Sequence, residues 1–308
     1  RRPEKIKRLL ETDELKSTDL IIGPFFPDEN ELIQEFSMVN RINVFNPFSN
    51  NAELIALNEF GFLFQPSYET LGRKSAEYLA SRLKRRKTCM VFYGTSRKDS
   101  VQAAAFIQKA TEAGLQVVSS LEIPKESSGK IISILATPTE FDEWKNPIEF
   151  ELKQDSIGAI YVASDDPLIY TKVIGGVDTR ADSIVMVGSE NWIYDHAVDF
   201  EKFQSLGVVF TAPGFTAPYN LHYKAFMKKY IRGHGRLPSP YAKMGYEMMW
   251  FLASSLKKYG VYFQEGLNKE GFVRGYLSEG YNYQYSHDNQ LVPFIKFSSG
   301  QLKLIQTR

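Results

Sequence analysis

Short apolar runs rich in β-branched and aromatic residues alternate with stretches of helical periodicity along the whole chain. The runs that we predict to be strands are residues 19–23, 43–46, 88–94, 116–123, 157–164, 183–189 and 207–211. Most of them are apolar at consecutive positions, which is typical of strands covered by helices on both faces. The alternation therefore predicts an α/β fold built on one or two doubly wound parallel sheets.

Several of the intervening segments begin with residues that cap helices. The predicted N-cap residues are Asp28, Ser67, Asp166 and Ser239. Glu31 completes a capping box with Asp28, and a proline follows Asp166 and Ser239 at the first helical position. From Tyr241 to Leu256 the apolar residues fall at helical spacing, and Gly260 follows as a stop. We predict a core helix there, with its methionine and aromatic stripe used for packing.

The composition describes a folded chain without a strong overall electric field. Its 308 residues are 43% hydrophobic and 24% charged, which predicts a large core and two domains. The 37 Lys and Arg residues nearly balance the 36 Asp and Glu residues and leave a net charge of +1. No nucleic-acid partner is therefore expected. The basic run at residues 84–87 is interpreted as the solvated end of a helix.

The single cysteine, Cys89, lies in the apolar run at residues 89–93. We predict a buried strand cysteine there, and one cysteine excludes an internal disulfide and a cysteine-based zinc site. The longest apolar stretches, such as residues 248–253, are well short of the roughly 20 residues that span a bilayer. The chain is therefore not expected to span a membrane.

Recognisable catalytic motifs are missing from the sequence. It contains no G-x-G-x-x-G, G-x-x-x-x-G-K-[ST], H-E-x-x-H or G-x-S-x-G motif. Residues 276–280 lack the first glycine of a nucleophile elbow and predict a turn, and Pro167 makes Asp165-Asp166 a helix start. The histidines, His196, His222, His234 and His287, show no metal-ligand spacing. We predict no enzyme, no metal site and no cofactor.

The predicted carboxyl ends of the strands are the informative positions, because ligands of open α/β sheets bind there. These ends are residues 23–26, 46–50, 93–96, 163–165, 188–192 and 212–215. They are rich in small hydroxyls, amides and aromatic rings, which suit a small polar ligand, but they bring together no nucleophile and base. Binding without turnover is the natural interpretation. The alternative is that they are ordinary turn and cap residues.

The order of several short segments resembles the type I periplasmic-binding-protein superfamily, especially the substrate-binding proteins of branched-chain amino-acid ABC transporters. The segments are DLIIGP at 19–24, INVFNPFS at 42–49, FLFQPS at 62–67, VFYG at 91–94, VGSE at 187–190 and LPSPYA at 237–242. The resemblance covers nearly the whole chain. It implies two Rossmann-like doubly wound lobes that are joined by three crossovers and close on a ligand.

By this resemblance, lobe I is expected to comprise residues 1–66 and 216–284, and lobe II residues 67–215 and 285–308. The crossovers would lie near residues 65–67, 213–216 and 285–289. The family's opening strand, first helix and following strand have no counterpart in this sequence. Lobe I is therefore expected to lack its N-terminal strand, helix and strand.

The ligand groups that the resemblance carries over are only partly present. Phe25-Phe26-Pro27-Asp28 stands where amino-acid binders hold a carboxylate with serines, whereas Ser49 and Asn50 are retained. Lys98 replaces an aromatic that covers the ligand, and Glu190 matches an acid of amine-binding members. The cleft is expected to prefer a neutral or cationic, partly aromatic ligand. The predicted ligand-binding residues are Phe25, Phe48, Ser49, Asn50, Tyr93, Ser164, Glu190 and Trp192.

Two functions follow from the resemblance. The first is an extracytoplasmic solute-binding protein, with a small-molecule ligand and an ABC permease as partner. The second is a non-transport interaction or regulatory domain of a cell-envelope lipoprotein with a degenerate cleft, whose partner would be peptidoglycan-associated. Loss of the carboxylate loop favours the second, and retention of Ser49, Asn50 and Glu190 favours the first. Both place the chain in the periplasm or outside the cytoplasm, with a lipid anchor as one option.

Overall fold

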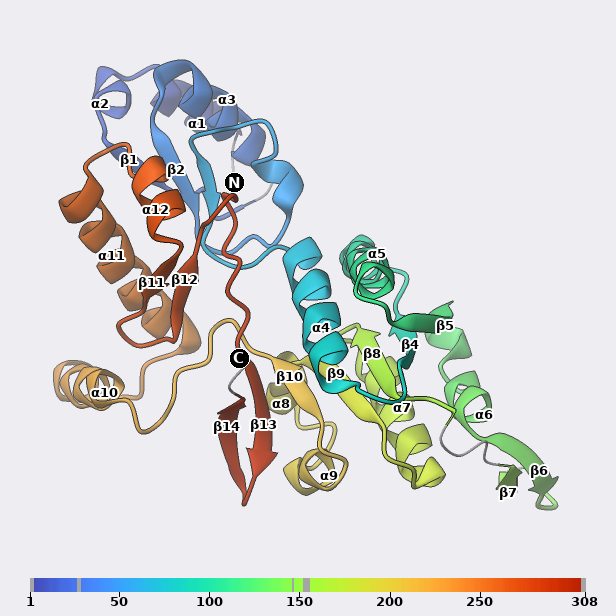
Figure 1. Cartoon of the computed structure of the whole chain (residues 1–308). Helices are drawn as coiled ribbons and strands as arrows, with labels where there is room; N and C mark the ends of the chain where they lie inside the picture. The colour runs from blue at the N-terminus through green and yellow to red at the C-terminus, as the bar shows by residue number, and fades with distance from the viewer. Residues whose placement is uncertain (1–2, 27–28, 146, 152–155, 306–308) are drawn as a thin grey trace. The chain divides into compact units, whose positions relative to one another are not determined.

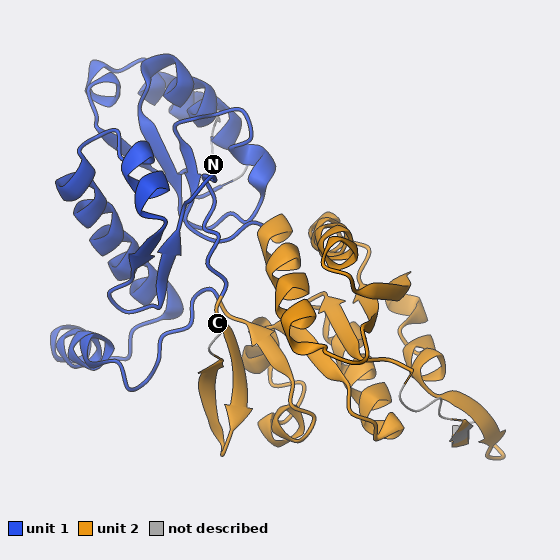
Figure 2. Cartoon of the chain, in the orientation of Figure 1, with its two compact units in different colours: residues 1–67, 213–292 blue, residues 68–212, 293–308 orange. Residues whose placement is uncertain are grey.

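The computed structural model describes residues 3–26, 29–145, 147–151 and 156–305. The chain divides into two compact units, which Figure 2 shows in different colours. Unit 1 comprises Arg1–Ser67 and Pro213–Val292, and unit 2 comprises Tyr68–Ala212 and Pro293–Arg308. The chain therefore crosses between the units three times, at 67/68, 212/213 and 292/293.

Unit 1 is built on a parallel three-stranded sheet of order β1-β2-β3, with a separate antiparallel pair β11-β12 (Figure 1). Its strands are β1 (Leu20–Ile22), β2 (Asn43–Asn46), β3 (Gly61–Leu63), β11 (Phe272–Arg274) and β12 (Gly280–Asn282). Its α-helices are α1 (Pro3–Leu10), α2 (Asp13–Lys16), α3 (Asn30–Asn40), α10 (Leu221–His234), α11 (Pro240–Tyr259) and α12 (Gln264–Glu270), and η2 (Ala52–Leu54) is a short 3₁₀ helix.

The core of unit 1 is dominated by aromatic rings. Phe45, in the buried strand β2, stacks on Phe62 of β3 at 5.2 Å and lies 5.9 Å from Phe251 of α11. Phe251 and Leu252 are almost completely buried, so α11 supplies one wall of this core. The predicted core helix after Ser239 is confirmed, and the Ser239 hydroxyl accepts a hydrogen bond from Ala242 N at 3.2 Å as its cap.

Unit 2 contains a seven-stranded sheet of order β14-β13-β10-β9-β8-β4-β5, in which β10 to β5 are parallel and β13 and β14 antiparallel. Its strands are β4 (Thr88–Tyr93), β5 (Gln116–Glu122), β6 (Thr137–Phe141), β7 (Pro147–Glu151), β8 (Ala159–Ala163), β9 (Val185–Ser189), β10 (Val209–Thr211), β13 (Phe294–Ser298) and β14 (Gln301–Ile305). Its helices are α4 (Tyr68–Arg82), α5 (Arg97–Glu112), α6 (Lys130–Leu135), α7 (Pro167–Arg180), α8 (Asn191–Asp195) and α9 (Phe200–Ser205), with η3 (Lys125–Ser127) as a 3₁₀ turn.

The central strands of unit 2 are buried on both faces, as their continuous apolar runs predict. Cys89 lies in β4 and is fully buried, which confirms the predicted strand cysteine, and burial raises the pKa of its thiol to about 11. Asp166 caps α7 through a bond from Leu168 N of 3.0 Å, as predicted. The predicted cap at Asp28 lies outside the described residues.

The third crossing lies eight residues later than the sequence suggested. Residues 285–292 belong to unit 1, because Leu63 N donates to His287 O at 2.9 Å and Ser67 N to the Asp288 carboxylate at 3.0 Å. Leu63 and Asp288 also form a parallel β-bridge. The segment thus adds hydrogen bonds to the edge strand β3 before the chain enters unit 2.

Unit 1 also contains a histidine whose ionisation is coupled to folding. The His287 ring stacks on Phe62 at 4.5 Å, and its Nδ1 lies 3.1 Å from Gly61 O. Burial lowers the pKa of His287 from its ordinary value of 6.5, against a smaller raising effect of the Gly61 carbonyl. As the pH falls, His287 therefore becomes protonated at a higher pH in the unfolded chain than in the folded chain.

We expect unit 1 to lose stability as the pH falls from above 6.5 through the lowered pKa of His287. Urea denaturation at a series of pH values, read by hydrogen exchange of unit 1 amides, measures this loss. The His287→Gln variant should show a flatter dependence over the same interval. An equal slope in both proteins would contradict the assignment to His287.

Candidate ligand-binding site

The strand ends of unit 1 are organised by one buried amide. Asn46, the last residue of β2, accepts hydrogen bonds at its Oδ1 from Phe48 N at 3.1 Å and Ser49 N at 2.9 Å. Its Nδ2 donates to Pro24 O at 3.3 Å, in the loop that follows β1. Asn46 is 4% exposed, so these bonds are shielded from water and hold the two loops together.

Exposed aromatic side chains gather at these loops. The Phe25 and Phe48 rings lie 5.3 Å apart, and Phe48 meets Tyr241 of α11 edge-on at 5.8 Å. The three side chains, which we call the aromatic trio, are 55%, 41% and 71% exposed. Large apolar groups left in contact with water and with one another are typical of a binding surface. The structure thus brings together the predicted residues Phe25 and Phe48 and adds Tyr241.

Tyr241 corrects the sequence-based interpretation, which placed it in the packing stripe of α11. It lies in the first turn of the helix, whereas the buried apolar residues of α11 begin at Met248. Helical spacing alone predicts which face a residue shares, but not where along the helix the core begins. The sequence pointed only to the partner of Tyr241 in this contact, because Phe48 was predicted to lie at a strand end.

Ser49 and Asn50 are partly used for local structure. The Ser49 hydroxyl accepts a bond from Asn51 N at 3.1 Å, and the Asn50 amide donates to Pro66 O at 2.6 Å. The Ser49 hydroxyl hydrogen and the Asn50 side-chain oxygen make no hydrogen bond to the described residues. Each residue therefore keeps one polar group for a ligand, a donor on Ser49 and an acceptor on Asn50.

In unit 2, the strand ends that carry predicted site residues are neighbours. Tyr93 ends β4, Ser164 follows β8 and Glu190 follows β9, and these strands are adjacent and parallel. Their carboxyl ends therefore meet at one edge of the sheet. Tyr93 and Glu190 are half-buried, whereas Ser164 is 4% exposed and its hydroxyl accepts a bond from Asp166 N at 3.2 Å.

A charged cluster completes this edge of unit 2. Lys98 Nζ lies 3.3 Å from the Asp165 carboxylate, to which the Asn191 side-chain amide also donates at 3.1 Å. Burial acts to lower the pKa of Lys98, but Asp165 and Asp99 outweigh it and the net shift is upward. Lys98 therefore stays protonated and paired, and it is not a free anion-binding group.

Trp192 is a core residue and offers no exposed surface to a ligand. Its side chain is 0% exposed, its ring stacks on Tyr170 at 4.6 Å, and Nε1 donates to Ser164 O at 2.9 Å. The sequence-based prediction that Trp192 contacts the ligand is therefore corrected. The physical reason is Gly188, because its missing side chain leaves the space on β9 that the indole fills.

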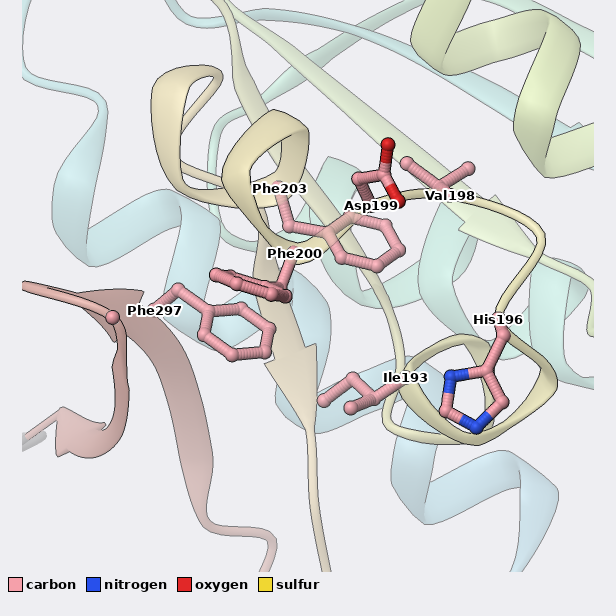
Figure 3. A pocket seen from close by; sticks show the side chains of 8 residues that line it. Ile193, His196, Val198, Asp199, Phe200, Phe203 and Phe297 are labelled. Carbon is pink, nitrogen blue, oxygen red and sulfur yellow. The ribbon is translucent and has the colours of Figure 1, made fainter.

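Unit 2 also contains a pocket of about 280 Å³ between α8, α9 and the β13-β14 hairpin (Figure 3). It is lined by Ile193, His196, Val198, Asp199, Phe200, Phe203, Phe297 and Gly300. Phe203 and Phe297 lie parallel at 6.3 Å, and Phe200 lies 5.9 Å from Phe297. None of the predicted ligand-binding residues lines this pocket, so it is a feature separate from the strand ends.

The other candidate chemical groups serve local structure. The Ser278 hydroxyl donates to Glu247 at 2.8 Å within the turn between β11 and β12, as predicted for residues 276–280. Among the described residues, His, Cys, Asp and Glu side chains form no group of three or more that could hold a metal ion. In the same part of the chain, no helix is long and apolar enough to cross a bilayer.

Neither a protein-family model nor a curated protein sequence matches this chain. Solved structures with the same arrangement are numerous, however. The chain is similar to an ABC transporter substrate-binding protein from Desulfitobacterium hafniense in complex with Leu, with 16% identity, 98% of this chain and 84% of that chain covered, and a TM-score of 0.65. A putative branched-chain amino acid ABC transporter structure from Rhodospirillum rubrum has 13% identity, the same coverage and a TM-score of 0.72.

A third similar structure is a solute-binding protein of an ABC transporter from R. palustris in complex with benzoate. It has 12% identity, covers 99% of this chain and 81% of that chain, and has a TM-score of 0.56. These likenesses extend over both units and agree with the parallel sheets and the three crossings described above. The chain therefore has the type I periplasmic-binding-protein fold, as the resemblance in its sequence implied.

Proposed function

We propose that this chain is an extracytoplasmic solute-binding protein that binds a small ligand, without turnover, through residues at the ends of its parallel strands. The aromatic trio of Phe25, Phe48 and Tyr241 is the observation that carries the proposal. Three contacting rings that remain 41–71% exposed lie at the sheet edge where open α/β folds bind ligands. An ABC permease is the corresponding partner. The similar structures, which are ABC transporter components, support this role.

The proposed ligand is neutral or cationic and carries an aromatic or apolar part. The aromatic trio supplies an apolar wall whose ring faces also attract cations. In unit 2, Lys98 at the strand ends is already paired with Asp165, and Glu190 adds a further negative charge at the end of the adjacent strand β9. An anionic ligand would have to compete with that pairing. The similar R. palustris protein is in complex with benzoate, which supports a ligand with an aromatic ring.

Three ligands with the same ring and different charge test this proposal. We expect benzylamine and benzamide to raise the melting temperature more than benzoate does, because the predicted contacts include no Lys or Arg and Lys98 is paired with Asp165. Thermal-shift titration of the full chain measures the order. Strong stabilisation by benzoate, leucine or glutamate would contradict the proposed ligand charge. No response to any amine, amide, amino acid or sugar would contradict solute binding itself.

The Phe48→Ala variant locates the site. Removing the central ring of the aromatic trio should weaken binding of the best probe by about 1–2 kcal/mol, the contribution of a partly buried aromatic side chain. Calorimetry of the full chain measures the change. Phe272→Ala is the matched control, since Phe272 is 52% exposed on β11 and outside the trio. Equal affinity in wild type and Phe48→Ala would place the site elsewhere.

A second candidate function is an interaction or regulatory domain of a cell-envelope lipoprotein with a degenerate ligand site. It is favoured by the local use of the Ser49 hydroxyl oxygen and the Asn50 amide, which leaves each residue one group for a ligand. A folded chain that responds to no small molecule but does respond to muropeptides or peptidoglycan-associated protein would support it. Both functions place the chain outside the cytoplasm, and the second adds a lipid anchor.

A further inference from the structure

Helix α10 carries an unusual concentration of positive charge. Its 14 residues include Lys224, Lys228, Lys229 and Arg232 but no Asp or Glu. The whole chain has a net charge of only +1, so this is a local patch rather than a part of a general field. Phe226 is the one residue of α10 that is buried. Figure 1 shows α10 as a peripheral helix of unit 1 beside the end of α11.

The contacts of α10 determine which face it turns to the protein. Phe226 packs against Tyr246 of α11 at 4.8 Å and lies 5.8 Å from Tyr230, one turn further along. On the same side, Lys243 of α11 lies 5.8 Å from the Tyr223 ring. Residues 223, 226, 227 and 230 follow the spacing of one helix face, so the opposite face is turned outward.

The outward face combines cations with apolar residues. Leu221, Lys224, Lys228 and Arg232 lie along it at helical spacing, and all four are exposed. These three cations and Lys229 form no ion pair or side-chain hydrogen bond with the described part of the chain. Apolar side chains frame the helix: Tyr219 before it, Leu221 at its start and Leu237 after it are 65%, 78% and 69% exposed.

We propose that the outward face of α10 docks the chain on an anionic lipid surface. The row of cations would pair with lipid phosphates, while Leu221, Leu237 and Tyr219 would enter the interfacial region beside them. This helix has a cationic side, and exposed leucine and tyrosine side chains lie at its ends. Such a surface fits a lipid boundary better than a purely acidic polymer, because the polymer offers no apolar layer. The residues involved are distinct from the proposed ligand contacts.

Flotation of the full chain with lipid vesicles tests the proposal. We expect binding to vesicles of phosphatidylcholine mixed with phosphatidylglycerol, weak binding to phosphatidylcholine alone, and release by added NaCl because salt screens the attraction. The variant Lys224→Glu/Lys228→Glu/Arg232→Glu should bind at least roughly ten-fold more weakly, because each cation near an anionic surface contributes severalfold. These exposed positions allow the fold to be retained, which circular dichroism checks.

A matched charge control is available in unit 2. The variant Lys84→Glu/Arg85→Glu/Lys87→Glu changes the net charge by the same amount at three exposed positions and should leave vesicle binding unchanged. Leu221→Asn/Leu237→Asn should weaken binding to vesicles but not to poly-glutamate. Equal loss in both charge variants, or binding to poly-glutamate with none to the vesicles, would overturn the proposal. Phe48→Ala should bind vesicles as the wild type does. Failure of the ligand proposal can therefore be distinguished from failure of the lipid-docking proposal.

Discussion

Replacing Glu247 by leucine should lower the free energy of unfolding of unit 1 by about 3–5 kcal/mol, because several donors lose their acceptor at about 1–3 kcal/mol each. Glu247 lies on α11 with 4% of its surface exposed. Its carboxylate accepts bonds from the backbone nitrogens of Tyr276, Leu277 and Ser278 at 2.9, 2.7 and 3.2 Å. Leucine would leave these donors without this acceptor, and the Leu277 nitrogen is in a buried position.

The turn that Glu247 holds also receives a bond from Asn220 Nδ2 to Leu277 O of 3.1 Å, and its Tyr276 ring lies 4.3 Å from His222. The turn joins β11 to β12, and a side chain at Gly275 would overlap both the Glu247 carboxylate and Ser278. The Ser278 hydroxyl adds a fourth bond to the same carboxylate at 2.8 Å. Four donors around one buried carboxylate replace the water that it loses on folding, which explains how the charge is tolerated there.

Hydrogen exchange resolved by peptide measures the loss, because it reports unit 1 amides separately. Glu247→Gln should lie between wild type and Glu247→Leu, since one acceptor oxygen remains. Glu279→Leu is the matched control, because Glu279 is a half-buried acid in the same turn that accepts no such bonds from the described residues. A loss below about 1 kcal/mol for Glu247→Leu would show that the turn relaxes or that water replaces the carboxylate.

Most of the parallel strands could be predicted from their apolar runs, whereas the short parallel strand β3 was not among the predicted strands. Strands β4 and β8 are covered on both faces, so nearly every residue in them is apolar. Strands β13 and β14 were not predicted. They lie at the edge of the unit 2 sheet, and exposed positions such as Lys296 and Lys303 interrupt their apolar pattern.

The sequence was sufficient to predict which loops form the candidate site, but not which of their side chains face outward. Parallel strands end at a common edge, and that rule alone selected the loops of Phe25, Phe48 and Glu190. Which side chain in a loop faces outward depends on contacts far away in the sequence. Tyr241 and Phe48 are 193 positions apart in the sequence, and Lys98 and Asp165 are 67 positions apart. Periodicity carries no information about such pairs.

Trp192 is a second residue whose environment could not be predicted from the sequence, because it was expected at the site and is buried instead. A tryptophan beside a strand end is a reasonable ligand contact by residue type. In the fold, the indole instead lies over Gly188, with Phe210 of the neighbouring strand β10 edge-on at 6.1 Å. Its role is to close the core beneath the loops that carry Ser164 and Glu190. Replacing Trp192 should therefore lower the free energy of unfolding of unit 2.

Trp192→Ala should destabilise unit 2 by about 3–5 kcal/mol, because it removes a fully buried indole from a packed core. Trp192→Phe keeps most of the stacking on Tyr170 but loses the bond to Ser164 O, and should cost less. Trp144→Ala is the matched control, since that indole is 79% exposed. Hydrogen exchange of β8 and β9 amides measures the order. Equal protection in Trp192→Ala and Trp144→Ala would return Trp192 to the candidates for direct ligand contact.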